Sequence, residues 1–230
     1  MRKEFLAGAA VAALMAAFSN VTPASAQQPP LMNWSGFYVG AHAGWGWARF
    51  SGTWIDTSSN NLYPWRTKPS GILAGLHTGQ NWQVNTFVYG WEADVSATGG
   101  WDETVSGFAS TSQSVLTKMS LLASLRARLG MFLNPSTLVY VTGGLAYTNA
   151  KATGTDPANS PVTTKFNTFG GVVGVGAEWK QTQNFSWRLE GLYYIFNKSN
   201  FITVSGANQY LDAKLKDALA IRIAGTWYFP

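Results

Sequence analysis

The sequence predicts an all-β fold: an eight-stranded antiparallel transmembrane up-and-down β-barrel with a packed polar lumen, preceded by a signal peptide. Three observations lead to this prediction. They are an export signal at the N-terminus, a composition poor in charge but rich in aromatic residues, and eight segments in which apolar and polar residues alternate. Together they favour a sheet that is apolar on one face, polar on the other, and closed on itself.

The N-terminus has the three parts of a secretory signal peptide. Arg2 and Lys3 precede an apolar run over residues 5–18, and the small residues ASA follow at 24–26. An apolar anchor that stays attached is the alternative, but the run is shorter than the roughly 20 residues that a spanning helix needs. We therefore expect three parts: a signal peptide at 1–26, a short lead at 27–35 and a barrel at 36–230.

The composition is that of a membrane barrel more than of a soluble domain. Charged residues make up 12% of the chain, about half of the roughly 25% usual in soluble domains, beside 11 Trp, 9 Tyr, 13 Phe and 24 Gly. The absence of cysteine excludes a disulfide scaffold, a thiol nucleophile and a cysteine-ligated metal site. The net charge of +5 is spread without a basic run, so nucleic-acid binding is not supported.

The connections between the alternating segments also favour a barrel. The segments lie at about 36–48, 71–84, 87–98, 117–132, 137–151, 166–180, 184–197 and 215–229. Long polar connections near 49–70, 99–116, 152–165 and 198–214 alternate with tight turns at 85–86, 134–136 and 181–183. This alternation is typical of an outer-membrane barrel, whose long loops face outside and whose short turns face the periplasm.

Alternation within the segments predicts which side chains face lipid. In the segment 87–97, aromatic and small apolar residues at odd positions alternate with Glu92 and Asp94 at even positions. The segment 119–131 fits a helix with a leucine stripe as well as a strand, but its neighbours have period two and favour the strand. As a strand, it places Met119 and the odd-numbered residues on the lipid face and Arg126 and Arg128 on the other.

Strand length agrees with a membrane span. Residues 37–47 are ten steps of about 3.4 Å, and a tilt near 40° leaves roughly 26 Å along the membrane normal, close to an apolar band of about 25 Å. Aromatic girdles are expected at its two edges. They would contain Trp82, Phe87, Phe132, Phe185 and Phe229 on the side of the tight turns, and Trp45, Trp47 and Tyr147 on the side of the long loops.

Eight charged residues fall on the polar face and would point into the lumen: Glu92, Asp94, Arg126, Arg128, Glu178, Arg188, Glu190 and Arg222. Because an eight-stranded barrel is only wide enough for side chains to fill it, these four acids and four arginines should form a hydrogen-bonded plug. The alternative, that the carboxylates act as a catalytic acid and base, is disfavoured because an equal number of arginines shares the face.

The two histidines and three aromatic residues of the first long connection are candidate binding residues. His42 and His77 lie on facing strands and could both point inward, and imidazole is a usual haem ligand. Two lone histidines in a packed polar lumen are more often only hydrogen-bonded. Trp54, Tyr63 and Trp65 either contact a surface ligand or pack on the barrel rim. No serine stands in a motif such as G-x-S-x-G, so a lipid-hydrolysing enzyme is not supported.

Several stretches resemble the small outer-membrane β-barrel family of alphaproteobacteria, the porin-family outer surface proteins that include hemin-binding members. They are WSGFYVGAHAGWGW at 34–47, TGQNWQ at 78–83, VYGWEADVSA at 88–97, LRARLG at 125–130, LVYVTGGLAY at 138–147 and RLEGLYY at 188–194. The resemblance covers nearly the whole chain after the signal peptide. It implies an OmpA-like eight-stranded barrel in the bacterial outer membrane, often surface-exposed.

The resemblance also implies a role and a set of partners. We expect a non-enzymatic envelope protein with a structural and surface-exposed, adhesive or interaction role. The alternative is a small-solute porin or a hemin-binding uptake protein, with haem as the only candidate cofactor. Expected partners are outer-membrane lipids and lipopolysaccharide, the barrel assembly machinery and an extracellular ligand. Trp227 and Phe229 match a C-terminal assembly signal, although Pro230 follows them where the family ends on an aromatic residue.

Overall fold

The computed structural model describes residues 32–56, 61–107, 114–156, 159–196, 201–204 and 209–229. The expected signal peptide at 1–26 and the terminal Pro230 lie outside these ranges. No helix in the described ranges is both long and apolar enough to cross a membrane.

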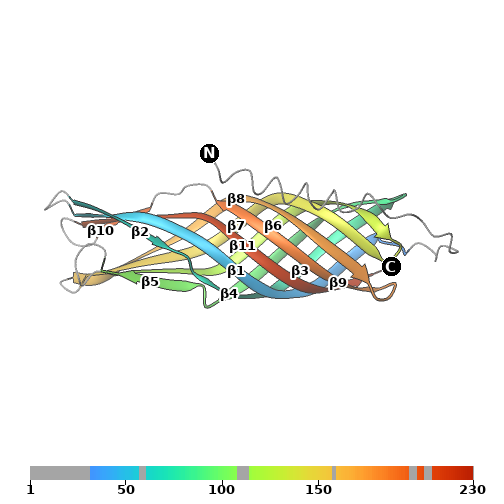
Figure 1. The fold of residues 1–230 in the computed structure, drawn as a ribbon, viewed down its shortest axis with the longest axis horizontal. Coiled ribbons are helices and arrows are strands. Elements are labelled where there is room, and N and C mark those ends of the chain that lie inside the picture. The colour runs from blue at the N-terminus through green and yellow to red at the C-terminus, as the bar shows by residue number, and fades with distance from the viewer. Residues whose placement is uncertain are drawn as a thin grey trace. The chain divides into compact units, whose positions relative to one another are not determined.

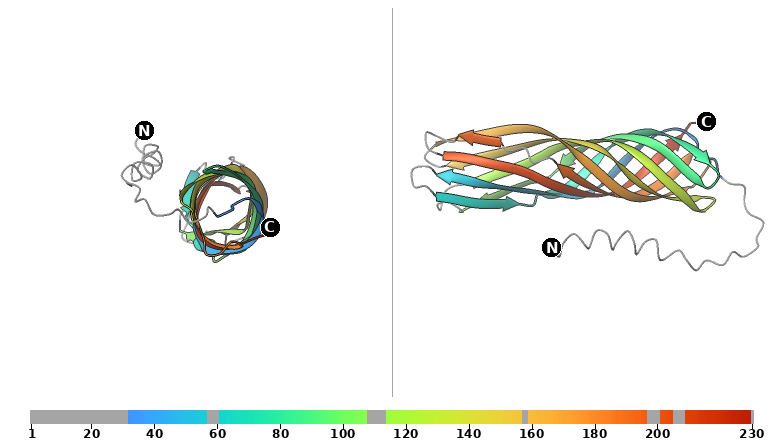
Figure 2. Two further views of the ribbon diagram at one scale, coloured as in Figure 1. Left: turned by 90° about the vertical axis from the view of Figure 1, so that its right-hand side faces the viewer. Right: turned by 90° about the horizontal axis from the view of Figure 1, so that it is seen from above.

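Eight long strands form a closed antiparallel ring. They are β1 (Gly36–Asp56), β3 (Ser70–Val84), β4 (Phe87–Gly99), β6 (Ser114–Asn134), β7 (Thr137–Asp156), β8 (Asn159–Lys180), β9 (Phe185–Phe196) and β11 (Gln209–Tyr228). Each pairs with its neighbour in this series, and β11 pairs with β1, from Tyr38 opposite Tyr228 to Asp56 opposite Gln209. The view down the ring in Figure 2 shows this closure, which confirms the predicted up-and-down barrel (Figures 1 and 2).

Three short strands belong to the connections that the sequence predicted to be long polar loops. They are β2 (Asn61–Thr67), β5 (Asp102–Ser106) and β10 (Phe201–Val204), paired with β1, β6 and β11 respectively. The strands β1, β7, β8 and β11 also continue well beyond their predicted ends. The predicted connections 49–70 and 152–165 are therefore mostly β-sheet. We call the end of the barrel that contains β2, β5, β10 and the strand segments paired with them the extension. The opposite end, which contains the tight turns, is the turn end (Figure 1).

The three tight turns lie where the sequence placed them. The β3–β4 hairpin turns at Asn85 and Thr86, and Asn85 has a positive φ of 53°. Asparagine tolerates this left-handed conformation better than most residues. The β6–β7 and β8–β9 turns follow Asn134 and Lys180.

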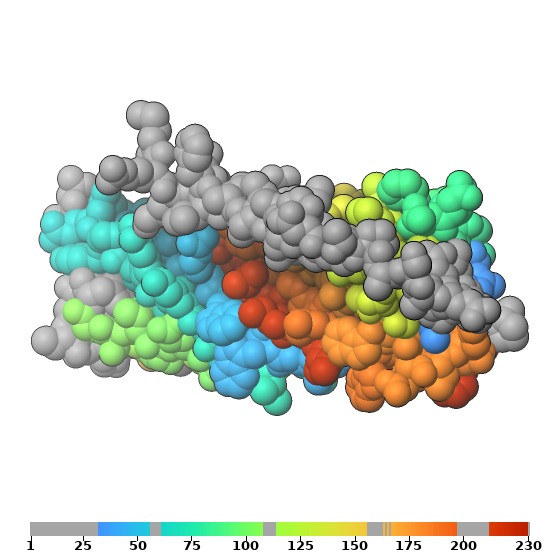
Figure 3. Space-filling view, turned by 45° about the vertical axis from the view of Figure 1, so that its right-hand side comes forward, coloured from blue at the N-terminus to red at the C-terminus, as the bar shows by residue number. Residues whose placement is uncertain are grey.

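Between the turn end and the extension, the outer wall is apolar, as predicted. Leu125, Leu145 and Phe169 are more than half exposed. The residue beside each of them on the opposite face is buried inside, as Arg126, Ala146 and Thr168 are. On the face visible in Figure 3, β1 in blue, β11 in red and β9 in orange lie side by side. Trp45 and Trp47 are exposed toward the extension, and Trp82, Phe87 and Phe229 toward the turn end, as expected of two aromatic girdles.

Two β-bulges lie where the wall leaves the apolar band, and one of them overturns a sequence prediction. The register of β6 with β7 shifts between Met119 and Leu121, and that of β1 with β11 shifts between Arg49 and Phe50. A bulge adds one residue to a strand, so beyond it the residues that would have pointed outward point inward, and the reverse. Met119 therefore points inward and is fully buried, not lipid-facing as predicted.

Two apolar clusters fill the interior of the barrel at its two ends. At the turn end, Trp34 of the lead is fully buried among Tyr38, Val88, Leu138 and Tyr228. The Trp34 backbone N–H donates to Gln83 Oε1 at 2.9 Å, and Lys180 Nζ donates to the carbonyl oxygen of Asn33. Phe132 packs on this cluster, so its predicted place in the lipid-facing girdle is wrong.

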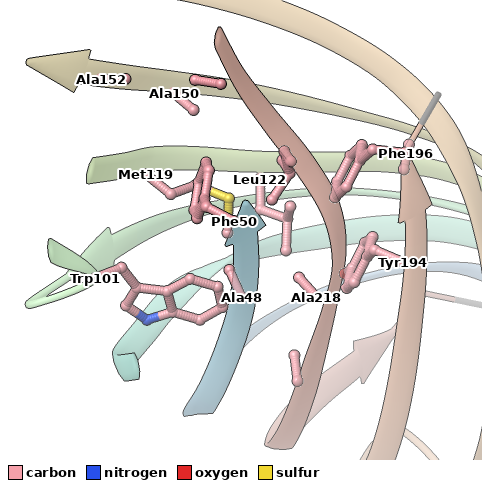
Figure 4. Close-up of a cluster of buried hydrophobic side chains, with 14 of the residues drawn as sticks. Ala48, Phe50, Trp101, Met119, Leu122, Ala150, Ala152, Tyr194, Phe196 and Ala218 are labelled. Atoms are coloured by element: carbon pink, nitrogen blue, oxygen red, sulfur yellow. The ribbon is translucent and has the colours of Figure 1, made fainter. Parts of the chain in front are cut away.

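The interior of the extension holds the larger apolar cluster. Phe50, Trp101, Met119 and Leu122 converge there with small residues of β7 and β11 (Figure 4). The loop aromatics of the sequence analysis belong to the same cluster: Trp54 and Trp65 are buried in it, and Tyr63 packs against it. The side chains of Trp54 and Trp65 thus pack inside the barrel, and Tyr63 is partly buried against them.

Candidate functional site

The eight charged residues predicted for the lumen all point into it. Each is at most 7% exposed. They come from β4, β6, β8, β9 and β11, where strict alternation places every second residue inward. We call Glu92, Asp94, Arg126, Arg128, Glu178, Arg188, Glu190 and Arg222 the lumen network.

Glu190 and Asp94 hold the half of the lumen network nearer the extension. Arg126 Nη1 lies 3.0 Å from Glu190 Oε1, and Arg222 Nη2 lies 2.6 Å from Glu190 Oε2. The same two arginines reach Asp94, with Arg222 Nη1 at 2.9 Å from Oδ1 and Arg126 Nη2 at 3.2 Å from Oδ2. Each guanidinium therefore bridges two carboxylates from different strands, which fixes the distance between opposite walls.

Glu92 and Glu178 hold the half nearer the turn end. Glu92 forms ion pairs with Arg126 and Arg188, and Glu178 forms one with Arg128. Arg188 Nη2 also lies 3.4 Å from Glu178 Oε2. Arg126 contacts Glu92 in this half as well as Asp94 and Glu190 in the other. Arg188 joins Glu92 to Glu178 within this half, so the eight charges make one continuous network across the lumen.

Neutral side chains complete the carboxylate contacts, and most of them were not singled out from the sequence. Tyr38 donates to Glu92 at 2.8 Å, Tyr140 to Glu190 at 2.9 Å and Tyr228 to Glu178 at 2.8 Å. The Arg128 guanidinium also lies 3.7 Å from the centroid of the Tyr140 ring. The inward parity of Tyr38 and Tyr228 was the available signal, since a tyrosine in a packed lumen must place its hydroxyl near an acceptor.

The two histidines, expected on facing strands, both point inward and meet inside the lumen. His42 Nδ1 lies 3.4 Å from His77 Nδ1, and the rings stack with centroids 5.7 Å apart. His42 Nε2 contacts Ser96 Oγ at 2.7 Å, and His77 Nε2 contacts Thr226 Oγ1 at 3.0 Å.

A haem group does not fit this arrangement. Haem iron needs a free ring nitrogen, whereas all four ring nitrogens of the pair contact a protein atom. Both histidines are nearly buried, and there is little space around them, since a Cβ on Gly40 would overlap the His77 ring and a Cβ on Gly75 would lie 2.8 Å from His42 Nε2. Among the residues that the structure describes, no group of three or more His, Asp or Glu is placed to hold a metal ion.

The predicted C-terminal assembly signal lies on the outer wall at the turn end. Trp227 and Phe229 are 52% and 43% exposed, and the Phe229 N–H donates to the carbonyl oxygen of Phe37 at 2.9 Å. This places both aromatic side chains on the face that meets lipid. Whether the assembly machinery recognises them stays a prediction.

The geometry of a lipid-facing barrel with a filled lumen agrees with comparisons to known proteins. The family model described as "Outer membrane protein beta-barrel domain" matches residues 9–216. The chain belongs to this family. It is therefore an integral protein of the bacterial outer membrane, as the sequence predicted.

Relatives and a solved structure support the same conclusion. The chain is 30% identical over 194 residues to the 31 kDa outer-membrane immunogenic protein of Brucella melitensis, with 80% of this chain and 79% of that protein covered. It is 31% identical to the 22 kDa outer membrane protein of Rhizobium leguminosarum, with 77% and 72% covered. The crystal structure of OprG from Pseudomonas aeruginosa matches with a TM-score of 0.51 at 12% identity, covering 85% of this chain and 97% of OprG, which shows a shared fold.

Proposed function

We propose that this outer-membrane barrel is a non-enzymatic envelope protein with a closed lumen, which presents its extension outside the cell. The lumen network is the observation that carries the proposal. Its eight charges contact one another across the lumen and are almost completely buried. Since a solute would have to displace these paired charges, the network supports a structural and surface role over transport.

The apolar clusters support a closed barrel independently. Trp34 with its partners fills the turn end, and the cluster around Trp101 and Met119 fills the extension. A solute would therefore have to pass two apolar layers as well as the lumen network. The lumen carboxylates also lack the solvent access that a catalytic acid or base for an outside substrate requires.

The orientation follows the usual rule for such barrels, in which short turns face the periplasm and long connections face outside. The extension would then be the surface that antibodies and other molecules meet. The Brucella relative carries the word "immunogenic" in its name, which fits this orientation. An adhesive or interaction role would then depend on outward-facing residues of the extension, because its aromatic residues pack inside.

Recording in planar lipid bilayers tests the closed lumen. The refolded chain should give no steady openings under conditions where an open porin conducts. Steady, reproducible openings would contradict the proposal and favour a small-solute pore. Loss of those openings in a variant that adds bulk to the lumen, such as Gly174→Leu, would locate the pathway there.

Cysteine labelling tests the orientation, because the natural chain has no cysteine of its own. Thr163→Cys lies on the exposed face of the extension and Gln181→Cys in an exposed tight turn. A membrane-impermeant maleimide should label Thr163→Cys on intact cells and Gln181→Cys only after the outer membrane is permeabilised. The reverse pattern would show that the extension faces the periplasm.

A further inference from the structure

Three lysines form a row across the outer wall of the extension. Lys118 of β6 lies opposite Lys151 of β7, and Lys151 lies opposite Lys165 of β8. All three point outward, since Ala150 and Ala152 beside Lys151 point into the apolar cluster (Figure 4). We call Lys118, Lys151 and Lys165 the lysine row.

The bulge in β6 creates this row. On the membrane side of the bulge, odd-numbered residues of β6 face outward, and beyond it even-numbered residues do. Without the extra residue, Lys118 would point into the apolar cluster. The bulge thus brings a third positive charge beside Lys151 and Lys165, although like charges directly opposite one another destabilise a sheet.

No lysine of the lysine row forms an ion pair with a carboxylate within the described part of the chain. Asp102 of β5 is in register with Lys118, but none of the three lysines has a carboxylate oxygen within salt-bridge distance there. On the opposite wall of the extension two cations form ion pairs, Arg49 with Asp217 and Lys214 with Asp212. The row is therefore a concentrated positive patch, in which three lysines stand beside the single carboxylate of Asp102.

The row also lies at a defined height above the apolar band. Outward from the membrane on β7 and β8, Leu145 is followed by the ring pair Tyr147 and Phe169, then by the hydrogen-bonded pair Asn149 and Asn167, and then by the lysines. Four residues of tilted strand separate Tyr147 from Lys151, about 10 Å along the membrane normal. Aromatic rings mark the hydrocarbon boundary, and flexible lysine side chains can extend back toward it, into the headgroup layer.

We propose that the lysine row binds the phosphate groups of lipopolysaccharide in the outer leaflet. Phosphate oxygens would accept from the ammonium groups and remove the repulsion that the register imposes. The inference rests on the proposed orientation, which places the row in the outer leaflet. It concerns one arc of the wall, formed by β6, β7 and β8, where annular lipopolysaccharide would be held.

Binding in detergent tests the proposal with matched variants. The probe is deep-rough lipopolysaccharide with two lipid A phosphates, titrated against the full-length refolded protein. Replacing all three lysines (Lys118→Gln, Lys151→Gln, Lys165→Gln) should weaken binding roughly 100-fold, at roughly fivefold for each lysine. A control with the same loss of charge on the opposite wall (Arg49→Gln, Lys214→Gln, Lys216→Gln) should lose less than about threefold.

Three outcomes of this titration would overturn the proposal. Equal losses in both triple variants would mean that only net charge matters. Equally tight binding of dephosphorylated lipopolysaccharide would exclude the phosphates as the recognised groups. Displacement of lipopolysaccharide by millimolar inorganic phosphate would indicate a site for the free anion and not for the lipid headgroup.

A stability measurement separates binding from a purely structural role. Lys151→Gln removes the central charge, so it should raise the urea midpoint of unfolding in lipopolysaccharide-free detergent and reduce the gain in midpoint on adding lipopolysaccharide. A lower midpoint without lipopolysaccharide would show that the row stabilises the fold by itself, against the proposal. Because binding in detergent needs no orientation, failure of the cysteine-labelling test would overturn the orientation and leave this result standing.

Discussion

The membrane band and the extension are two parts of one barrel with opposite patterns. In the band, the outer wall is apolar and the interior contains the lumen network; in the extension, the interior contains Trp101 and Met119 and the outer wall carries the lysine row. Five strands, β1, β6, β7, β8 and β11, run continuously through both parts, and the bulges lie where the pattern changes. The surrounding medium therefore decides which face is apolar: lipid around the band, water around the extension.

The largest effect is expected from breaking the lumen network. Arg126→Ala removes contacts to Glu92, Asp94 and Glu190 and leaves buried carboxylates without their partner. The free energy of unfolding should fall by about 3–5 kcal/mol. Urea unfolding in lipid vesicles measures it, with Arg66→Ala on the exposed wall of the extension as the control, expected within about 0.5 kcal/mol of the natural protein. Equal effects of the two would contradict the contrast between interior and exterior.

A second prediction places one substitution on the same wall at two heights. Leu125 and Leu116 both face outward on β6, Leu125 in the band and Leu116 in the extension, at 55% and 36% exposure. Leu125→Arg should cost about 2–4 kcal/mol near the membrane midplane, whereas Leu116→Arg should change stability by less than about 0.5 kcal/mol. A similar cost at both positions would mean that the extension is also surrounded by lipid.

A third prediction tests the apolar interior of the extension. Met119 is fully buried there, so Met119→Gln places an amide among apolar side chains and should cost about 1–3 kcal/mol. Met119→Leu keeps the volume and should cost less than about 1.5 kcal/mol. If Gln and Leu were tolerated equally, water would have to reach this interior.

The alternation of apolar and polar residues was enough to predict which side chains point inward in the membrane band, but not in the extension. Each inward charge of the lumen network could be placed from its own strand, because period two holds wherever one face meets lipid. The bulge next to Met119 could not be placed, since one inserted residue leaves no mark in an apolar stretch. The segments 49–70 and 152–165 resembled loops because their outward residues are polar. Large apolar residues that point inward, such as Trp54, are few there, and others, such as Ala152, are small.

The pairing inside the lumen also lay beyond the sequence. Arg126 and Glu190 are 64 residues apart, and their contact depends on how far each strand is shifted against the next around the whole ring. A single strand predicts which side a residue faces, whereas the stagger of all eight strands decides which residue it meets. The same stagger brought Tyr140 to Glu190 and His42 to His77.

The smallest effect is expected at the histidine pair. His42→Ala with His77→Ala should leave the absorbance change on adding hemin the same as in the natural protein, because every ring nitrogen already contacts Ser96, Thr226, Arg222 or the other histidine. Hemin association with the outer wall would be equal in both proteins. A Soret band that appears in the natural protein and is lost in the double variant would show instead that haem reaches the histidines. The lumen network would then have to open, and the interior of the membrane band would be a ligand-binding pocket and not a closed core.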